Sequence, residues 1–454
     1  MIHATSTNCI FPISDFTEVK SKVLSWVNRF STFCFLDNNG YRHEPALWYK
    51  PGPDESSSAA LGDKAPVDAG KIECLAAAGV RRSITAKAGE DALGNLGSFI
   101  REKPCYLFGH LGYDLALETE SVVTSGHDGP GFPDLFFFEP QYVVKLREHT
   151  LEIITEDGDA GQVYESIIGS LPGNRTLSTG PQLRPRLTQE EYLSIIKALQ
   201  AHIRRGDCYE INFCQEFYHD NAVIDPLAVY QRLSNVSPNP FAAFYRLHDK
   251  YLLCESPERY LAMRAGHIIA QPIKGTAKRF VGNEETMART HFSESAKDRT
   301  ENVMIVDLVR NDLSKCCEPG SVAVDELFGV YTFPQVYQMI STVSGDLREE
   351  VTFEDIIRAT FPMGSMTGAP KRRVLELIDH YEPTRRGLFS GAVGYIEPGG
   401  DFDFNVVIRS LLYNSTRRYV SVQAGSGITH YSEPLLEWEE CLVKAAAMLR
   451  ALRE

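Results

Sequence analysis

The chain of 454 residues is long enough for two or three domain-sized units, and 43% apolar and 23% charged residues are typical of a globular protein. A formal net charge of −14 makes nucleic acid and anionic membranes poor partners. No apolar run is long enough to span a bilayer, no secretion signal is visible, and ten irregularly spaced cysteines indicate reduced thiols. We therefore expect a cytoplasmic protein.

The first part of the chain has the pattern of an antiparallel sheet. Residues 1–175 alternate short apolar segments with polar turns, as in Gln141–Leu146 and Thr150–Thr155. A stretch rich in proline, glycine and serine, Leu171–Pro181, predicts a connector. We therefore divide the chain into an N-terminal region, residues 1–175, and a C-terminal region, residues 188–454.

The C-terminal region begins with a helix signal. Thr188-Gln-Glu-Glu191 is typical of a capping box, in which threonine and glutamate side chains accept hydrogen bonds from free backbone N–H groups. Apolar residues follow at helical spacing until Gly206, which predicts the end of the helix. Strand, loop and helix signals then alternate along the rest of the chain, without an internal repeat.

Two single residues are candidates for acid–base or nucleophilic chemistry. Glu258 follows an apolar strand predicted over Tyr251–Cys254, where a carboxyl group can have a raised pKa and act as a general acid. Lys274 lies in a short turn predicted within Gln271–Thr276. Its amine can attack carbon only after it loses a proton, in a desolvated pocket or beside other cations. A structural glutamate and a loop cation are the alternatives.

Two pairs of carboxylates share the same spacing along predicted helices. Asp298 and Glu301 form the first pair, and Glu437 and Glu440 form the second, in the C-terminal helix. Three-residue spacing places both members of a pair on one helix face. Two such faces opposite each other would supply oxygen ligands for Mg²⁺. Solvated surface acids are the alternative.

The segment Gly364–Lys371 could bind an anion. Pro370 fits the first position of a helix, and the free N–H groups of that helix, with Ser365 and Lys371, would contact the ligand. A plain turn before a helix explains the same residues.

Three further residues could contact a ligand close to a strand end. Gly425 and Gly427, after a strand predicted over Tyr419–Gln423, would let a ligand approach the backbone, although a hairpin turn explains them equally well. Arg409, at the end of a strand predicted over Phe404–Arg409, could bind a carboxylate through two hydrogen bonds. The alternative for Arg409 is a structural ion pair on an edge strand.

In combination, these segments resemble the chorismate-utilising enzymes, a family that includes anthranilate synthase large subunit, aminodeoxychorismate synthase, isochorismate synthase and salicylate synthase. The resemblance is dense over residues 188–454 and looser in the N-terminal region, around Leu107–Asp114. The motifs that carry it are Gly206–Asn212, Glu255–Arg259, Pro272–Thr276, Lys297–Asn302, Asp307–Asp312, Ser365–Lys371, Ser390–Tyr395, Ala424–Ile428 and Glu437–Lys444.

The resemblance implies an α+β fold, with two large, mostly antiparallel sheets packed in a β-sandwich core and helices outside. It implies chorismate as the substrate and Mg²⁺ as the cofactor, held by Glu301 and Glu440, with Asp298 and Glu437 acting partly through water. The residues that it implies for substrate binding are Thr276, Ser365, Lys371, Arg409, Gly425, Gly427 and Lys444.

Lys274 distinguishes the branches of the family. Anthranilate synthases resemble the same motif with alanine at this position, whereas aminodeoxychorismate synthases carry the lysine. The resemblance therefore implies amination of chorismate at C4, giving 4-amino-4-deoxychorismate for para-aminobenzoate and folate synthesis. Lys274 would attack ring C2 while Glu258 protonates the departing C4 hydroxyl, and ammonia would then displace the lysine. A class I glutamine amidotransferase subunit is the expected ammonia source, because no glutaminase unit is visible in this sequence.

Anthranilate synthase large subunit is the closest alternative, followed by isochorismate synthase and by an inactive paralogue that binds chorismate or tryptophan and regulates a partner. Two residues depart from the family's pattern. Gln338 stands where histidine is common, and an amide cannot transfer a proton at neutral pH. Glu210 stands where glutamine is common. Beside an anionic substrate its carboxylate must be protonated, paired or turned away, and the sequence leaves all three open.

Overall fold

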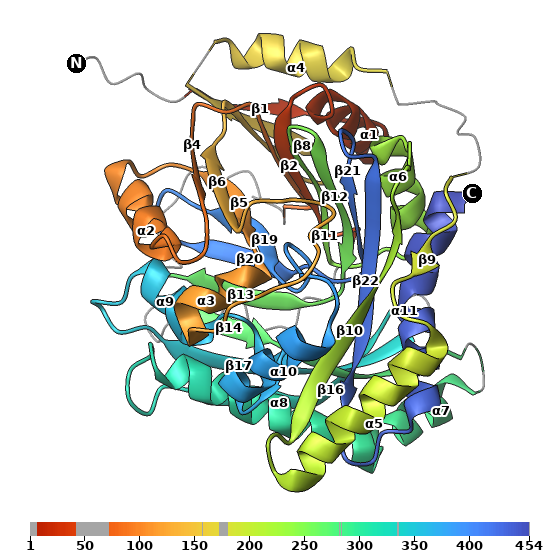
Figure 1. Cartoon of the computed structure of the whole chain (residues 1–454). Coiled ribbons are helices and arrows are strands. Elements are labelled where there is room, and N and C mark those ends of the chain that lie inside the picture. The colour runs from red at the N-terminus through yellow and green to blue at the C-terminus, as the bar shows by residue number, and fades with distance from the viewer. Residues whose placement is uncertain are drawn as a thin grey trace.

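The computed structural model describes residues 7–41, 72–156, 158–171, 180–280, 282, 284–333 and 336–453. The connector predicted over Leu171–Pro181 lies mostly outside these residues. Two large antiparallel sheets lie at the centre of the described part, and helices surround them (Figure 1). The predicted α+β fold with a two-sheet core is confirmed.

Within the described residues, the first sheet has twelve strands and the second has ten. In spatial order, the first sheet contains β1 (Thr7–Pro12), β8 (Thr150–Thr155), β7 (Tyr142–Leu146), β3 (Cys74–Ala78), β2 (Thr32–Asp37), β11 (Phe241–Leu247), β12 (Lys250–Ser256), β21 (Ser410–Asn414), β22 (Tyr419–Ile428), β10 (Glu210–His219) and β18 (Gly368–Ala369), with β9 (Arg184–Pro185) beside β10. The second contains β15 (Ile273–Lys278), β17 (Val336–Asp346), β14 (His267–Gln271), β13 (Arg259–Arg264), β20 (Phe402–Val406), β19 (Ala392–Ile396), β5 (Leu107–Leu111), β6 (Leu135–Glu139) and β4 (Arg82–Ala86), with β16 (Ala323–Thr332) beside β17.

The helices of the described part cover these sheets on their outer sides (Figure 1). They are α1 (Phe16–Val27), α2 (Ala92–Glu102), α3 (Ala116–Glu120), α4 (Ala160–Ile168), α5 (Gln189–Arg205), α6 (Pro226–Val236), α7 (Glu285–Ser293), α8 (Ala296–Ser314), α9 (Phe353–Thr360), α10 (Lys371–Tyr381) and α11 (Pro434–Arg453), with short 3₁₀ turns η2 (Tyr113–Leu115) and η3 (Gly364–Met366).

Strand alternation gives the first sheet two buried faces. Cys34 and Ala243 of this sheet pack in one core with Phe137 and Phe404 of the second sheet. Phe33, which precedes Cys34 on β2, points to the opposite face and packs with residues of α1, α4, α6 and α11. The first sheet is therefore covered by the second sheet on one side and by helices on the other.

The two regions expected from the sequence share both sheets. Strand β2 pairs with β11, so that Phe33 lies opposite Arg246 in the first sheet. Strand β5 pairs with β19, so that Leu107 lies opposite Ile396 in the second. Strands from before and after the connector are therefore neighbours in both sheets. The division of the chain into residues 1–175 and 188–454 remains a prediction.

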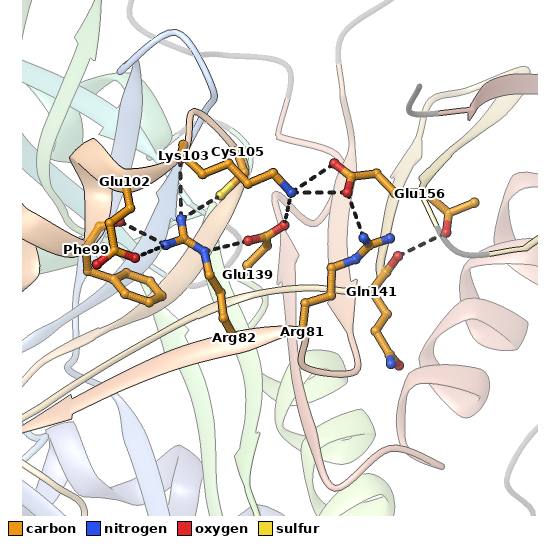
Figure 2. Close-up of polar contacts among 10 residues, drawn as sticks. Arg81, Arg82, Phe99, Glu102, Lys103, Cys105, Glu139, Gln141 and Glu156 are labelled. Atoms are coloured by element: carbon orange, nitrogen blue, oxygen red, sulfur yellow. Dashed lines mark hydrogen bonds and ion pairs between the residues drawn. The ribbon is translucent and has the colours of Figure 1, made fainter. Parts of the chain in front are cut away.

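A cluster of ion pairs ties the N-terminal strands to one another (Figure 2). Arg82 on β4 bonds to Glu139 on β6 at 2.6 Å, and Lys103, directly after α2, bonds to the same carboxylate at 2.7 Å. Lys103 and Arg81 both reach Glu156, directly after β8 of the first sheet, at 3.1 and 2.7 Å. The cluster therefore connects the edge strand β4 and its neighbour β6 in the second sheet to the end of β8 in the first, and as a network of charges it contributes more than isolated surface pairs would.

The predicted capping box of α5 is confirmed. Thr188 Oγ1 accepts a hydrogen bond from the backbone N–H of Glu191 at 3.3 Å, and the Glu191 carboxylate accepts one from the backbone N–H of Thr188 at 2.8 Å. Gly206 ends the helix with a left-handed φ of 84°, which glycine adopts without strain.

Three local predictions are wrong. Lys274 lies in strand β15 and not in a turn, because the segment pairs with β17 on both sides of a bulge between Ile273 and Thr276. Gly425 and Gly427 lie within β22, because this strand continues along β10 to Ile428. Arg409 follows β20, which is an internal strand of the second sheet and not an edge strand.

Candidate active site

A cavity of about 500 Å³ brings most of the candidate residues together. Its walls come from β15, β17, β22, α8, α11, the 3₁₀ turn η3 and the segments before β13 and β21. The predicted site residues that line it are Glu258, Lys274, Thr276, Asp298, Glu301, Ser365, Arg409, Gly425, Gly427, Glu440 and Lys444.

Two predicted site residues do not line the cavity. Lys371 is buried at the start of α10, where its amine donates to Asp312 on α8 at 2.7 Å and to the carbonyl oxygen of Thr360 at 3.4 Å. Glu437 is buried on α11, three residues before Glu440, and does not face the cavity. The predicted contacts of Lys371 with substrate and of Glu437 with metal therefore find no support in this arrangement.

Lys274 lies inside the protein and donates a hydrogen bond to a carboxylate oxygen of Glu210. The two side chains are 11% and 3% exposed. Burial lowers the pKa of Lys274, but the charge and hydrogen bond of Glu210, together with the charges of Glu301 and Glu258, raise it above its ordinary value. The free protein therefore holds Lys274 as an ammonium, and the open question about Glu210 is answered, because its carboxylate is paired.

Gly427 leaves room for this pair. A Cβ atom at Gly427 would lie 2.7 Å from Glu210 Oε1 and 2.9 Å from Lys274 Nζ. A side chain at position 427 would displace both groups, so glycine is favoured here by the close approach of charged side chains and not by a turn.

Glu258 lies between β12 and β13, next to Lys274 in the cavity wall. Burial raises the pKa of Glu258 to about 7, although hydrogen bonding by Ser365 and the charges of Lys274 and Lys444 oppose this rise. Its backbone is fixed, because its N–H donates to Ser256 Oγ at 3.2 Å and its carbonyl accepts from the N–H of Val406 at 3.0 Å. Near neutral pH a substantial fraction of Glu258 carries the proton that a general acid must supply.

Two cations face the cavity from the side of β21 and α11. Arg409 has a left-handed φ of 52°, and burial lowers the pKa of its guanidinium despite the nearby charge of Glu440. Lys444 donates to the carbonyl oxygen of Gly425 at 2.9 Å and pairs with Glu440 at 2.7 Å. In a protein with an excess of acidic residues, these cations make the cavity locally suitable for an anionic ligand.

Three carboxylates face the cavity from two helices, namely Asp298 and Glu301 on α8 and Glu440 on α11. Burial raises the pKa of Glu301 to about 7, whereas Lys444 holds the pKa of Glu440 below its ordinary value against the effect of burial. Within the described ranges, no three His, Cys, Asp or Glu side chains converge closely enough to hold a metal ion. The donor set nevertheless fits Mg²⁺, which prefers oxygen ligands and is commonly held by one or two protein carboxylates, substrate oxygens and water.

Two further lining residues had no assigned role in the sequence. Gln338 on β17 lies opposite Thr276 of β15 and is buried, and its Oε1 atom has no hydrogen-bond partner within the described part of the chain. Asn212 lies two residues after Glu210 on β10, and its amide donates to the carbonyl oxygen of Ser365 at 2.9 Å. Residues two apart in a strand point to the same face, so the position of Asn212 relative to Glu210 is the sequence signal that could have identified it.

Comparison with known proteins defines the class. Residues 44–450 match the family described as chorismate binding enzyme. The chain is 35% identical over 347 residues to aminodeoxychorismate synthase component 1 of Klebsiella aerogenes, and 31% identical over 360 residues to that of Bacillus subtilis strain 168; each match covers 76% of both chains. The structure resembles anthranilate synthase component I from Streptococcus pneumoniae TIGR4, with a TM-score of 0.75, 25% identity and coverage of 91% of this chain and 98% of the other.

The chain therefore belongs to the chorismate binding enzyme family. Both curated relatives just named are aminodeoxychorismate synthase component 1. Across the described ranges, no helix combines the length and the apolar character needed to cross a membrane.

Proposed function

We propose that this chain is the synthase subunit that converts chorismate and ammonia to 4-amino-4-deoxychorismate. The observation that carries the proposal is a buried lysine, Lys274, in a cavity with a carboxyl group of raised pKa, Glu258. The relatives named aminodeoxychorismate synthase component 1 support the same reaction. The resulting product is a precursor of para-aminobenzoate and folate.

The cavity offers complementary groups for a dianionic substrate. Arg409 can bind one carboxylate through two parallel hydrogen bonds, and Lys444 adds a positive charge beside the backbone of Gly425. Ser365 and Thr276 supply hydroxyl groups, and Gly427 allows the substrate to approach β22 closely. Lys371 is not part of this proposal, because Asp312 already binds its amine.

Mg²⁺ is the proposed cofactor, with Glu301 and Glu440 as ligands and Asp298 acting through water. When bound, the ion would neutralise the ring carboxylate of chorismate and draw electron density from the ring. Glu301 is suited to this role, because a buried carboxylate beside another acid is stabilised by a cation. Glu440 would exchange part of its contact with Lys444 for the metal.

The proposed reaction proceeds through a covalent adduct on Lys274. The neutral amine attacks ring C2, the ring double bonds shift toward C4, and the C4 hydroxyl leaves as water with the proton of Glu258. Ammonia then adds at C4, the double bonds shift back, and the lysine leaves C2 as an amine. The new ammonium at C4 returns a proton to Glu258, so that chorismate and ammonia give the aminated product and water.

We further propose a class I glutamine amidotransferase subunit as the source of ammonia. The relatives are named component 1, which implies a second component. Because ammonia itself is the nucleophile at C4, ammonium salts should support turnover without the second subunit.

Anthranilate synthase component I is the competing function, since its fold is the same. The two differ in product, so the test is product analysis with chorismate, Mg²⁺ and ammonium. We expect 4-amino-4-deoxychorismate with the enolpyruvyl group retained, and Lys274→Ala should lower its formation by about 1,000-fold or more. Fluorescent anthranilate as the direct product, or an unchanged rate and product after Lys274→Ala, would overturn the assignment.

A further inference from the structure

Glu210 and Lys274 form a buried ion pair between the two sheets, and Lys274 but not Glu210 lines the cavity. Glu210 begins β10 in the first sheet, and Lys274 lies on β15 in the second. The pair is tightly enclosed, because Gly427 on β22 approaches both charged groups and has no side chain. Such a contact fixes the position of the amine in the cavity and keeps it away from bulk water.

The proposed attack on C2 requires that Lys274 lose a proton inside this enclosed space. The carboxyl groups that raise the pKa of Lys274 most are those of Glu210, Glu301 and Glu258, and Glu440 also interacts with its charge. Glu258 must keep its own proton for the C4 hydroxyl, and Glu301 faces the proposed metal. Glu210 is the carboxylate that already accepts a hydrogen bond from the amine.

We propose that Glu210 positions Lys274 and accepts its proton when chorismate fills the cavity. The inference rests on the proposed function, because it concerns the nucleophile of that reaction. The proton moves from Nζ of Lys274 to the carboxylate of Glu210, which leaves a neutral amine and a neutral carboxyl group. When the lysine departs from C2 at the end of the reaction, Glu210 returns the proton and the ion pair forms again.

Exclusion of water provides the driving force for this transfer. Holding a carboxylate and an ammonium in a medium of low dielectric constant costs desolvation free energy, whereas a neutral acid and a neutral amine cost much less. Substrate that fills the cavity covers the part of the Lys274 side chain that is still exposed, 11%, and shifts the proton toward Glu210. The transfer moves no net charge into or out of the site, so it does not disturb the binding of the substrate carboxylates by Arg409 and Lys444.

With Glu210 as the acceptor, the supply of neutral amine does not depend on the pH of the solution, as long as Glu210 and Lys274 together hold one exchangeable proton. A glutamine at position 210 can hold the amine by a hydrogen bond but cannot take its proton. Lys274 would then have to release its proton to solvent, and the neutral fraction would rise tenfold per pH unit until the pKa of the amine is reached.

The first experiment measures adduct formation without ammonia. Wild type, Glu210→Gln and Glu210→Asp are mixed with chorismate and Mg²⁺ at a series of pH values, and the adduct on Lys274 is followed by peptide mass. We expect a rate in the wild type that does not change on the acid side of neutral pH. Glu210→Gln should lose about tenfold in rate per unit of falling pH, and Glu210→Asp should keep the flat profile at a lower rate. The wild-type profile in Glu210→Gln would overturn the proposal.

A second measurement separates this proposal from the proposed function. Acetic anhydride labels only neutral amines, so the pH dependence of Lys274 labelling in the substrate-free protein reports its proton directly. We expect labelling at lower pH in Glu210→Gln than in wild type, and identical curves would overturn the role of Glu210. A wild type that labels as expected but forms no adduct would instead refute Lys274 as the nucleophile of the proposed function. Should Glu210→Gln fail to fold, Glu210→Asp decides in the adduct assay, with a flat pH profile at a lower rate supporting the proposal and a tenfold loss of rate per unit of falling pH rejecting it.

Discussion

At the scale of single residues, Glu258 connects catalysis to stability. Its pKa is about 7 in the folded protein and 4.5 in its ordinary state, because burial disfavours the charged form. The folded state therefore holds more protons than the unfolded state between these two values. The free energy of unfolding must then fall as pH rises from about 4.5 to about 7 and stay lower above that range.

Replacement of Glu258 by glutamine should remove this loss of stability and also remove the proposed general acid. We expect Glu258→Gln to be more stable than wild type at about pH 8, by on the order of 2 kcal/mol, with little difference at about pH 4. Its kcat should fall by about 100-fold or more. Thermal unfolding at the two pH values, with kcat measured in parallel, tests both effects. A variant that is destabilised equally at both pH values would contradict the buried, protonated state of this side chain.

At the scale of secondary structure elements, strand β22 places two glycines with different constraints. A Cβ atom at Gly425 would lie 2.1 Å from the backbone oxygen of Phe213 on β10, which cannot move without breaking the pairing of the strands. A Cβ atom at Gly427 would meet only the ends of the side chains of Glu210 and Lys274. The two positions are matched controls for each other, since they lie two residues apart in one strand.

We expect Gly427→Ala to fold normally and to lose at least about tenfold in kcat, because the added methyl group displaces the amine of Lys274, the proposed nucleophile. Gly425→Ala should lower Tm by several degrees, because it opposes the backbone of β10. Circular dichroism and thermal unfolding report the fold, and product formation with ammonium reports the activity. Wild-type kcat in Gly427→Ala would show that the pair does not depend on this glycine.

The same elements show what the sequence can and cannot predict. Short-range signals were sufficient for the capping box at Thr188 and for the common face of Asp298 and Glu301, because both depend on spacing within one helix. The bulge in β15 interrupts the alternation around Lys274, and for this reason the local sequence pattern predicts a turn where the structure has a strand. The pairing of Lys274 with Glu210 depends on how two different sheets are placed, and no local pattern encodes it.

Lys371 illustrates the same limit for a predicted ligand contact. A lysine at the start of a helix is a reasonable anion-binding residue, but its partner Asp312 lies on α8, far away in sequence. Only the packing of α10 against its neighbours shows that the amine is already paired. Three of the four predicted acids, Asp298, Glu301 and Glu440, face the cavity, whereas Glu437 does not, although its spacing from Glu440 is the same as that of Asp298 from Glu301.

At the scale of the whole molecule, the sheets join residues from both ends of the chain. Strand β11 depends on β2 as a neighbour, and β19 depends on β5. A fragment of residues 188–454 would expose the edges of β11 and β19 and the apolar side chains that pack against the missing strands.

We therefore expect the fragment of residues 188–454 to lack a fixed tertiary structure and to form no product, although it contains every residue of the proposed site. The full chain should unfold in one cooperative transition in urea. Near-ultraviolet circular dichroism and urea titration of both proteins test this. A fragment that unfolds cooperatively and turns over chorismate would show that the C-terminal region is an independent domain.

The pairing of β2 with β11 also has a kinetic consequence. Local hairpins such as β7–β8 can form as soon as both strands are synthesised. Strand β2 can pair with β11 only after more than two hundred further residues have been synthesised. Until then the apolar surface of β2 and β3 is available to other chains, which favours aggregation during synthesis. We expect refolding from denaturant to be slow and concentration-dependent in yield, and production at low temperature or with added chaperones to increase the recovered protein.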